Sequence, residues 1–531
     1  MTVLAQLSLT GQILDSLHKS PLMYVNIGIK KQNIGTVSSE DGSFELHIPK
    51  ALEKDTLTFS LVGYGEINLP LQNLHTINPL KILLPQKIIP LERVQIMAKK
   101  SKEHKFGIKR RGLLIHFSDG MFNPEDSFEI GQLIKLGKGQ IKITSMNFYA
   151  LSSDDQPSKF RINFYRYADG KPMEKLIHKS LIEQKVITEG WVKFDLSDQE
   201  IYLSGDVIAA LEFLPPEDTL QKQINYEVKL GGSSKSFYRK NSLGEWNTPP
   251  HHYCLNITGL VNLGTPLPPD EDYESSPTFV YPSNVIGEDY YIYVNLPKGY
   301  KQKKNVKYPV IYLLDGNAYF DHIKNYVRES SEKNRFEKEP IIIGIGYKNA
   351  YFMDSLRIRD YTYPKALAQD SFSTSGGADL FYSFITNELI PHIDRNYNTD
   401  TTARTIMGHS FGGYFSLYAL LREMQSPAVK HQVFSNYISA SPSINYYNNY
   451  ILTQLEKLEK HKSHTLQKNS DLYATMGSNE LEGEMHQRFH MFRQILKDYR
   501  SLHLKTKVYQ NKDHLGTAIP SFEDAIKRLY K

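Results

Sequence analysis

The pattern of hydrophobic and polar residues changes character once along this 531-residue chain, close to residue 277. Before that point, short runs alternate apolar with polar residues and are bounded by turn-forming residues, which is typical of antiparallel strands. After it, fully apolar runs alternate with longer helix-compatible stretches, which favours a mostly parallel sheet covered on both faces. The pattern predicts a multidomain protein with two N-terminal β-sandwich domains followed by an α/β domain with a doubly wound sheet.

The first predicted domain spans residues 1–98, with strands at 7–14, 24–30 and 57–62. Its segments resemble the carboxypeptidase-regulatory-like β-sandwich, most specifically in the DGSF turn and the Gly63-Tyr64 pair. The segments are LTGQILD, PLMYVNIGIK, GTVSSEDGSFELHIP and LTFSLVGYG. Modules of this kind often precede outer-membrane receptors and surface enzymes in Bacteroidetes-type bacteria. The resemblance implies a structural or docking role.

Two linkers and a second β-sandwich are predicted next. Residues 99–111, KKSKEHKFGIKRR, are densely basic but contain few aromatics, so an inter-domain linker is favoured over a nucleic-acid or lipid patch. Residues 112–261 show short strands and turn signals without a long amphipathic helix, which predicts a second β-sandwich of jelly-roll type. Residues 262–277 are rich in Pro, Ser and acidic residues and are predicted as a linker. The α/β domain then covers 278–531.

Three aromatic residues of the second sandwich, Trp246, Tyr238 and Tyr253, admit two interpretations. If their side chains are exposed, they form a stacking platform for sugars and allow glycan or cell-surface contact through the β domains. If they are not, they are ordinary core and rim residues, and this second interpretation is favoured.

Composition narrows the possible functions. The formal net charge of +5 gives no reason to expect a nucleic-acid partner. The single cysteine, Cys254, excludes an intramolecular disulfide and a cysteine metal cluster, and it is expected to be a small buried side chain. No apolar run is long enough to span a bilayer. Residues 1–8, MTVLAQLS, resemble the end of a secretory signal, so we expect an exported protein, periplasmic or at the cell surface.

The stretch with the clearest chemistry is 405–420, TIMGHSFGGYFSLYAL. A short apolar run leads into Gly408-His409-Ser410-Phe411-Gly412 and then into an apolar helix-compatible segment, which is G-x-S-x-G in strand–turn–helix context. The glycines permit the sharp reversal, and the turn holds the serine hydroxyl clear of the sheet. A serine that only caps the helix is the alternative. The flanking pattern favours a nucleophile.

A serine nucleophile needs a base, and the base needs an orienting acid, in the chain order Ser, acid, His. His514 lies in the loop between a late predicted strand and the final predicted helix, where that base is expected. Glu480 is the first carboxylate after the preceding strand and is favoured as the acid, with Glu482 and Glu484 left open. No metal ion or other cofactor is expected for this chemistry.

The oxyanion of an acyl-transfer intermediate needs two N–H donors. Phe411 provides one by its position after the serine, and the loop after the apolar strand at 308–314 offers the other from Gly316 or Asn317. Residues near these loops are predicted to contact the substrate, namely Asp315, Tyr319, His409, Arg357 and Tyr361. For Asp315 a turn-shaping role, and for the segment around Arg357 a salt-bridged structural role, remain open alternatives.

With these residues collected, residues 275–531 resemble the esterase-D-type esterase family of α/β-hydrolases. The resemblance rests on YPVIYLLDGNAYF, RDYTYP, SGGADLFYSFITNELIPHIDRNY, IMGHSFGGYFSLYAL and the late DHLG. The family includes siderophore esterases, feruloyl esterases and mycolyltransferases. The resemblance implies ester hydrolysis with Ser410 as nucleophile, His514 as general base and Glu480 as acid, where many members carry Asp.

The resulting hypothesis is a serine esterase that acts through an acyl-enzyme on a small-molecule or glycan ester, with feruloyl, acetyl-sugar and siderophore esters as candidates. An acyltransferase with the same three residues is one alternative, because only the acyl acceptor differs. A surface glycan-binding protein with weak catalysis is another, although all three residue types of a triad are present. A peptidase is disfavoured, because nothing resembles the accessory domains of such enzymes.

Overall fold

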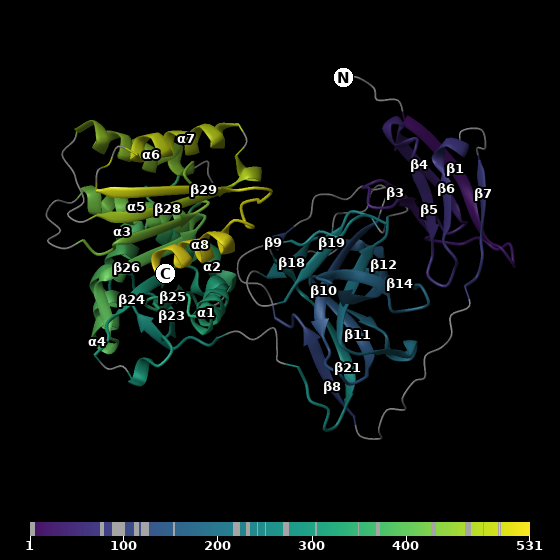
Figure 1. Ribbon diagram of the computed structural model, residues 1–531, viewed down its shortest axis with the longest axis horizontal. Coiled ribbons are helices and arrows are strands. Elements are labelled where there is room, and N and C mark those ends of the chain that lie inside the picture. The colour runs from purple at the N-terminus through teal and green to yellow at the C-terminus, as the bar shows by residue number, and fades with distance from the viewer. Residues whose placement is uncertain are drawn as a thin grey trace. The chain divides into compact units, whose positions relative to one another are not determined.

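The computed structural model divides into two compact units, residues 1–229 with 233–273 and residues 274–531 with 230–232 (Figure 1). Among the helices it describes, none is both long and apolar enough to cross a membrane. The residues described are 6–74, 79–87, 101–110, 116–117, 127–151, 154–215, 224–229, 234–241, 243–249, 251–268, 275–302, 305–348, 350–367, 372–425, 432–461, 469–481, 483–497, 499 and 501–531.

The N-terminal module of the first unit consists of two small sheets around one apolar core. One sheet has the strand order β4-β1-β7 and the other β3-β2-β5-β6. Alternation builds the core: in SFELHIP of β4, Phe44, Leu46 and Ile48 are buried while the residues between them are exposed. The strands are β1 (Gln6–Asp15), β2 (Asn26–Ile29), β3 (Gly35–Val37), β4 (Ser43–Pro49), β5 (Thr56–Ser60), β6 (Ile67–Pro70) and β7 (Leu80–Leu84).

The second module of this unit also places two sheets around a shared core rich in Phe and Ile. One sheet has the order β13-β12-β17-β10-β19 with β14 on β12, and the other β20-β18-β11-β21-β8 with β9, β15 and β16 attached. The strands are β8 (Ser101–Gly107), β9 (His116–Phe117), β10 (Phe128–Lys135), β11 (Ile141–Ala150), β12 (Asp154–Ala168), β13 (Lys171–Lys175), β14 (Leu181–Ile187), β15 (Gly190–Asp195), β16 (Ile201–Leu203), β17 (Asp206–Phe213), β18 (Tyr226–Lys229), β19 (Ser236–Arg239), β20 (His252–Tyr253) and β21 (Leu255–Asn262).

The structure corrects the prediction of a linker at 99–111. Residues 101–107 form β8, which pairs antiparallel with β21 from Gly107 opposite Asn256 to Ser101 opposite Asn262. Most of its charged side chains are exposed and only Phe106 is buried, so the basic run is an edge strand whose lysines discourage pairing with other chains. The second module therefore begins near 101 rather than 112.

The three aromatic residues considered for a sugar-stacking platform are packed against the protein. Tyr253 is a core residue, Tyr238 packs against the same core, and Trp246 packs with Tyr165 and the guanidinium of Arg239. The favoured core-and-rim interpretation therefore describes their packing. Cys254 is buried, as predicted.

The second unit is built on one eight-stranded sheet with the order β22-β23-β25-β24-β26-β27-β28-β29. The pairs from β25 to β29 are parallel, whereas β22 and β23 pair antiparallel at one edge. Strands β24 and β25 are buried along their whole length, which suits a sheet covered on both faces. The strands are β22 (Phe279–Pro282), β23 (Asp289–Asn295), β24 (Tyr308–Leu313), β25 (Ile341–Gly346), β26 (Thr399–His409), β27 (Asn436–Ala440), β28 (Ser470–Gly477) and β29 (Leu502–Tyr509).

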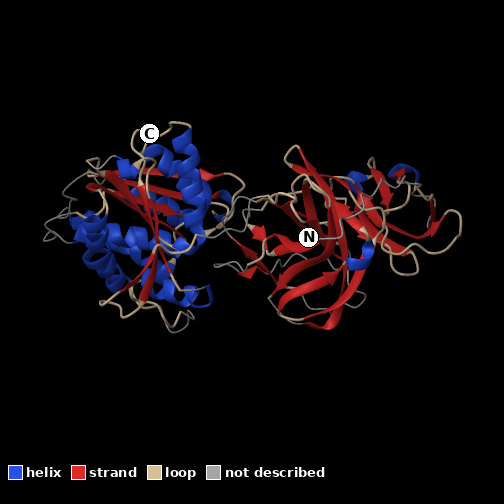
Figure 2. Cartoon of the chain, turned by 90° about the horizontal axis from the view of Figure 1, so that it is seen from below, coloured by secondary structure: helices blue, strands red, loops and turns tan. Residues whose placement is uncertain are grey.

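Helices flank this sheet (Figure 2). The helices α1 and α8 pack together, whereas α5 packs against β26 and β27 and also against α2, α3 and α6. The stretch SGGADLFYSFITNELIPHIDRNY contains α3, a π-helical turn at Phe384–Leu389, and α4. The helices are α1 (Gly316–Glu332), α2 (Ala350–Tyr361), α3 (Ala378–Ser383), α4 (Ile390–Asn396), α5 (Phe411–Gln425), α6 (Tyr446–His461), α7 (Glu484–Leu496) and α8 (Ala518–Leu529).

This topology positions the candidate site. In parallel strands the carboxyl ends lie at one edge of the sheet, and loops at that edge carry the ligand-contacting residues of open α/β sheets. The segments that follow β24, β26, β28 and β29 contain Asp315, Ser410, Glu480 and His514. Four separate stretches of sequence therefore meet at the carboxyl ends of the parallel strands.

Candidate active site

Ser410 lies alone between β26 and α5, in the left-handed region of backbone conformation with φ of 59°. A non-glycine residue in this region is strained and is held there by its surroundings. The hydrogen bonds that hold it run from Ser410 N to Ala440 O (3.0 Å), from Tyr414 N to Ser410 O (2.8 Å) and from Ser443 N to Ser410 O (3.2 Å). The structure thus has the sharp strand-to-helix turn that the G-x-S-x-G pattern predicts.

Close backbone approach requires glycine at Gly408 of the motif and at Gly413 directly after it. A Cβ atom at Gly408 would lie 2.4 Å from the carbonyl of Gly412, and one at Gly413 would lie 2.8 Å from the Ala440 oxygen. Both distances are shorter than real contacts, and the obstructing atoms belong to the backbone. Any side chain at these positions would therefore force the turn around Ser410 to open.

His514 and Glu480 form a direct pair. The Nδ1–H of His514, in the loop between β29 and α8, donates to Oε2 of Glu480 at 2.6 Å. The His514 side chain is 43% exposed and that of Glu480 only 10%, so the imidazole faces solvent while the carboxylate lies behind it. Since Nδ1 is committed to the carboxylate, Nε2 is the nitrogen left to exchange a proton.

The Glu480 carboxylate is fixed by several donors besides His514. Its Oε1 accepts hydrogen bonds from Ser441 Oγ (2.7 Å), Gly477 N (2.7 Å) and Thr517 Oγ1 (3.3 Å). Burial raises the pKa of this carboxyl, but the hydrogen bond and charge of His514 and the other donors outweigh burial, so the pKa lies below its ordinary value. The group is therefore ionised at neutral pH and can stabilise a protonated imidazole.

Glu482 and Glu484 were the other two candidates for the acid that orients His514. Glu484 begins α7, is 78% exposed and pairs with Arg488, so it does not contact His514. Glu482 lies outside the described residues. Glu480 is thus the carboxylate that the structure brings to His514.

The N–H groups predicted for oxyanion binding lie at two adjacent helix starts. Phe411 begins α5, and Gly316 and Asn317 begin α1, so these N–H groups have no acceptor within their own helices. A Cβ atom built on Gly412 would lie 3.2 Å from Asp315 Oδ2, which shows how closely the two turns approach. The Asn317 side chain instead bonds the backbone of Tyr347 in both directions, with Nδ2–O at 2.8 Å and N–Oδ1 at 2.7 Å.

A buried ion pair lies beneath these helix starts. Arg357 on α2 binds Asp315 through two hydrogen bonds of 3.0 Å, Nε to Oδ1 and Nη2 to Oδ2. The Asp315 N–H donates to the Tyr361 hydroxyl at 3.1 Å, and the Arg357 guanidinium lies 5.8 Å from the centre of the Phe411 ring. Asp315 itself has φ of 52°. This pair fixes the turn that precedes α1, which agrees with the salt-bridged structural role left open by the sequence.

His409, the residue before Ser410, is held in one tautomer. Its Nε2 lies 2.7 Å from the carbonyl oxygen of His514, which can only accept, so Nε2 carries the hydrogen. Its Nδ1 therefore accepts from the Tyr319 hydroxyl, 3.0 Å away. Burial, together with the nearby charge of His514, lowers the pKa of His409 well below its ordinary value, so the ring is neutral. A chain of two hydrogen bonds thus ties α1 to the backbone of His514.

Four of the five residues predicted to contact the substrate have buried side chains in this structure. Asp315, Tyr319, His409 and Tyr361 are all buried, and their polar groups are engaged with protein atoms. They form a supporting layer behind Ser410 and His514. Arg357 is mostly buried and also paired, although its guanidinium lies against Phe411.

Aromatic residues adjoin Ser410 on the other side. The Phe411 ring packs edge-on against Phe372 (5.6 Å between centroids) and Tyr446 (5.9 Å). Tyr446 is followed by three consecutive residues in left-handed conformation, with φ of 47°, 51° and 64° at 447–449. This turn could not be predicted from the sequence, because a run of Tyr and Asn fits either a helix or a loop. Such strain commonly accompanies a functional position.

Sequence reasoning also missed Ser441, whose hydroxyl contacts Glu480. It follows β27, a short strand that was not predicted, and its contact depends on pairing between β27 and β28. The one feature of the sequence that could have pointed to Ser441 is the segment 437–443, YISASPS, in which small residues follow a short apolar run. Within the described part of the chain, no group of three or more His, Cys, Asp or Glu side chains is arranged to hold a metal ion.

A serine on a strand-to-helix turn, with a carboxylate and then a histidine after later parallel strands, is the arrangement of the α/β-hydrolase class. Residues 283–524 match the family model described as "Putative esterase", and residues 9–96 match the CarboxypepD_reg-like domain. The chain belongs to this esterase family, and both recognitions made from sequence are confirmed.

Relatives with described roles share this part of the chain. The "Ferri-bacillibactin esterase BesA" of Bacillus subtilis is 35% identical over 204 residues, covering 36% of this chain and 66% of that protein. The "Siderophore triacetylfusarinine C esterase" of Aspergillus fumigatus is 31% identical over 220 residues, covering 40% of this chain and 70% of that protein. The crystal structure of BES protein from Bacillus cereus is 26% identical, with a TM-score of 0.41, over 49% of this chain and 98% of that one.

Proposed function

We propose that this protein is a serine esterase that hydrolyses the ester bonds of siderophores. The observation that carries the proposal is the His514–Glu480 pair, which lies beside the strained Ser410 turn in a chain of the esterase family. Relatives named as siderophore esterases support the substrate class. We further propose that the chain folds as two β-sandwich modules followed by a doubly wound α/β-hydrolase domain.

In the proposed mechanism, Nε2 of His514 takes the Ser410 proton as the serine oxygen attacks the ester carbonyl. The imidazolium that forms is stabilised by the ionised Glu480 carboxylate. The N–H groups of Phe411 and of Gly316 or Asn317 bind the oxyanion, where pre-positioned donors lower the barrier most. The alcohol leaves with the proton from His514, and water then attacks the acyl-enzyme by the same route.

The aromatic residues around Phe411 support a substrate with aromatic groups close to the ester. Phe411 directly follows Ser410, and its ring packs against Phe372 and Tyr446, which also contact each other. Aromatic faces favour stacking with planar groups and bury a large apolar area. An exported location, periplasmic or at the cell surface, remains part of the proposal, supported by the N-terminal sequence and by the CarboxypepD_reg-like module.

The test uses the purified full chain with p-nitrophenyl acetate and with bacillibactin and triacetylfusarinine C, each with and without iron, followed by mass spectrometry. Ser410→Ala and His514→Ala should each lower kcat by about 10⁵-fold, because residues of a triad act as a unit. His486→Ala, an exposed histidine on α7, is the matched control and should retain full activity. Activity that survives Ser410→Ala would refute the nucleophile. Turnover of p-nitrophenyl acetate without cleavage of either siderophore would refute only the substrate class.

A further inference from the structure

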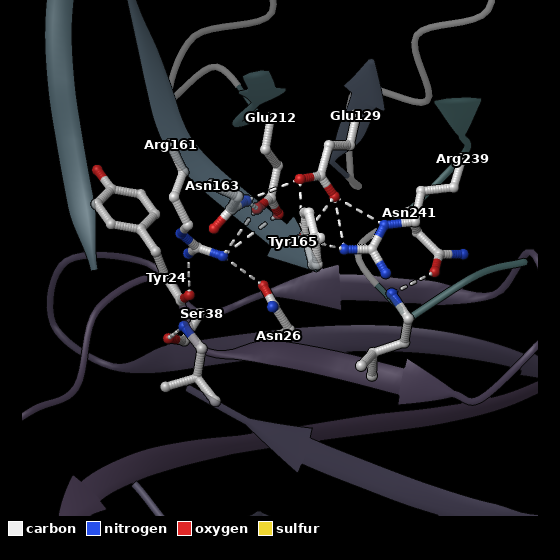
Figure 3. A network of polar contacts seen from close by, with 12 residues as sticks. Tyr24, Asn26, Ser38, Glu129, Arg161, Asn163, Tyr165, Glu212, Arg239 and Asn241 are labelled. Atoms are coloured by element: carbon white, nitrogen blue, oxygen red, sulfur yellow. Dashed lines mark hydrogen bonds and ion pairs between the residues drawn. The ribbon is translucent and has the colours of Figure 1, made fainter. Parts of the chain in front are cut away.

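The two β-rich modules of the first unit are joined by a buried polar network (Figure 3). Arg161 on β12, 1% exposed, donates to Asn26 Oδ1 at 2.7 Å and to the Tyr24 carbonyl in the N-terminal module. Its charge is balanced by Glu212 on β17, at 3.2 Å and fully buried. Although Nε of Arg161 has no partner, its two terminal nitrogens bind groups from both modules, and a buried guanidinium is costly to leave unpaired. This contact therefore holds the two modules in one arrangement.

Further bonds support the same junction. The Lys31 N–H donates to the Leu243 carbonyl at 2.9 Å, and Asn241 Nδ2 donates to the Gln32 carbonyl at 3.1 Å. At the edge of the junction, Lys159 pairs with Glu40 at 2.8 Å. The junction is therefore specific, and any cavity within it is pre-formed.

Such a cavity exists, with a volume of about 830 Å³ and walls from both modules. This is the size of pockets that hold small molecules. Its charged lining residues are Lys30, Lys87, Lys175, Arg239, Glu66 and Glu174.

Most of these charges are already paired within the protein. Lys30 binds Glu66 at 2.6 Å, Glu174 binds Arg166 at 2.5 Å, and the Nε of Arg239 binds Glu129 at 2.7 Å. The two acidic residues of the lining are thus neutralised. The remaining charge of the cavity is positive.

Lys175 and Lys87 carry that remaining charge. Among the residues that the structure describes, neither ammonium group forms a hydrogen bond or an ion pair. The Lys175 ammonium lies 5.7 Å from the centre of the Tyr165 ring, on a side chain that is half-buried. Burial lowers the pKa of Lys175 to about 8, because the charged form is removed from water without a carboxylate in direct contact. An anion in the cavity would supply the missing partner.

We propose that this cavity binds a small molecule with two or more negative charges, whose carboxylate or phosphate oxygens pair with Lys175 and Lys87. The pocket lies in the β-rich unit and is separate from the ester-cleaving residues in sequence and in fold. It gives the junction of the two modules a binding role in addition to a structural one.

The test is isothermal titration calorimetry on the full chain with citrate and with inorganic phosphate, against acetate at equal ionic strength. We expect saturable binding of citrate, phosphate or both, with Kd below about 1 mM, and no saturable heat with acetate. Binding of citrate alone identifies carboxylate as the preferred group, and binding of phosphate alone identifies phosphate. Saturable binding of acetate, or no saturable heat with any probe, overturns the proposal.

Variants assign the site. Lys175→Met and Lys87→Met should each weaken binding about tenfold or more, because each removes a charge-assisted hydrogen bond, and Lys175→Arg should retain it. Lys171→Met removes the same charge from the other, exposed end of β13 and should change Kd less than about twofold. Equal weakening by Lys171→Met would show a general charge effect and would overturn the proposal. Lys87 is exposed, so its variant keeps the test valid if Lys175→Met does not fold.

Discussion

Both units of the protein bury an arginine–carboxylate pair, but the two pairs do different work. In the esterase unit, Arg357 and Asp315 join α2 to the turn before α1, directly beneath the helix starts next to Ser410. In the β-rich unit, Arg161 and Glu212 lie where two modules meet, far in sequence from any catalytic motif. Buried pairs are costly to desolvate, so each marks a place where two backbone segments must keep one relative position. Arg357–Asp315 fixes the turn next to the proposed nucleophile, and Arg161–Glu212 fixes the junction of the two β-rich modules.

The largest effect should come from Glu480, the carboxylate that we propose as the acid of the esterase site. Glu480→Gln should lower kcat for p-nitrophenyl acetate by about 10³- to 10⁴-fold, because an amide neither fixes the His514 tautomer nor stabilises its protonated form. The fold should be retained, since the amide can still fill the space. Glu484→Gln on exposed α7 is the control and should leave kcat unchanged. A loss of less than tenfold in Glu480→Gln would show that another group orients His514.

The junction pair should be purely structural. Arg161→Met should lower the free energy of unfolding of the β-rich unit by about 4 kcal/mol, because Glu212 is left charged and buried. Both tryptophans of the chain, Trp191 and Trp246, lie in this unit, so their fluorescence reports its denaturation separately from esterase activity. Ester hydrolysis should be unchanged.

The same strand provides the control for Arg161→Met. Arg166 on β12 forms an exposed pair with Glu174, and Arg166→Met should cost at most about 1 kcal/mol. The double variant Arg161→Met/Glu212→Leu should recover most of the lost stability, because it removes the uncompensated charge. Reduced esterase activity in Arg161→Met would show that the two units are coupled, and that the junction pair is not purely structural.

Features that depend on nearby residues could be predicted from the sequence, whereas features that depend on long-range packing could not. Ser410, His514 and Glu480 could be predicted as candidates because motif, chain order and strand-end position are local properties, and the structure pairs His514 with Glu480. The buried layer behind Ser410 and His514 could not be predicted from the sequence. The contact between Tyr319 and His409 in that layer depends on which helix packs beside the turn. The network around Arg161 was missed for the same reason, since Tyr24 and Arg161 are 137 positions apart. The strand at 101–107 was taken for a linker because its charged side chains hide an edge strand.

A third prediction concerns a buried carboxylate that has no basic partner among the described residues. Burial raises the pKa of Glu423 on α5 to about 7, although hydrogen bonds from Tyr437 and Tyr382 oppose the shift. Because the folded pKa exceeds the unfolded value of 4.5, the folded state binds more protons between these values, and stability falls as pH rises through that window. The loss should be about 3 kcal/mol.

Denaturation followed by helical circular dichroism at about pH 5 and about pH 8 tests this. Glu423→Gln should remove most of the difference between the two pH values and should be more stable than the natural chain at the higher pH. Glu484→Gln, at an exposed glutamate, should leave the difference intact. An unchanged pH dependence in Glu423→Gln would show that other groups cause the loss of stability at high pH. Glu423 would then not differ in this respect from the paired carboxylates at the module junction, such as Glu212.

The smallest effect should come from the layer that supports the site. Tyr319→Phe removes the hydroxyl that donates to His409, at a cost of about 1 kcal/mol, and lets the His409 ring change tautomer or rotate. Because His409 bonds the His514 carbonyl, we expect kcat to fall by about fivefold to tenfold while KM changes little. Tyr326→Phe, on the same helix α1 with its hydroxyl bonded to the Glu523 carbonyl, is the matched control and should not alter kcat. Equal losses of stability in both variants with unchanged kcat would show that the chain from Tyr319 to His514 only packs the core, and that the esterase unit, like the β-rich unit, uses its buried polar contacts for assembly alone.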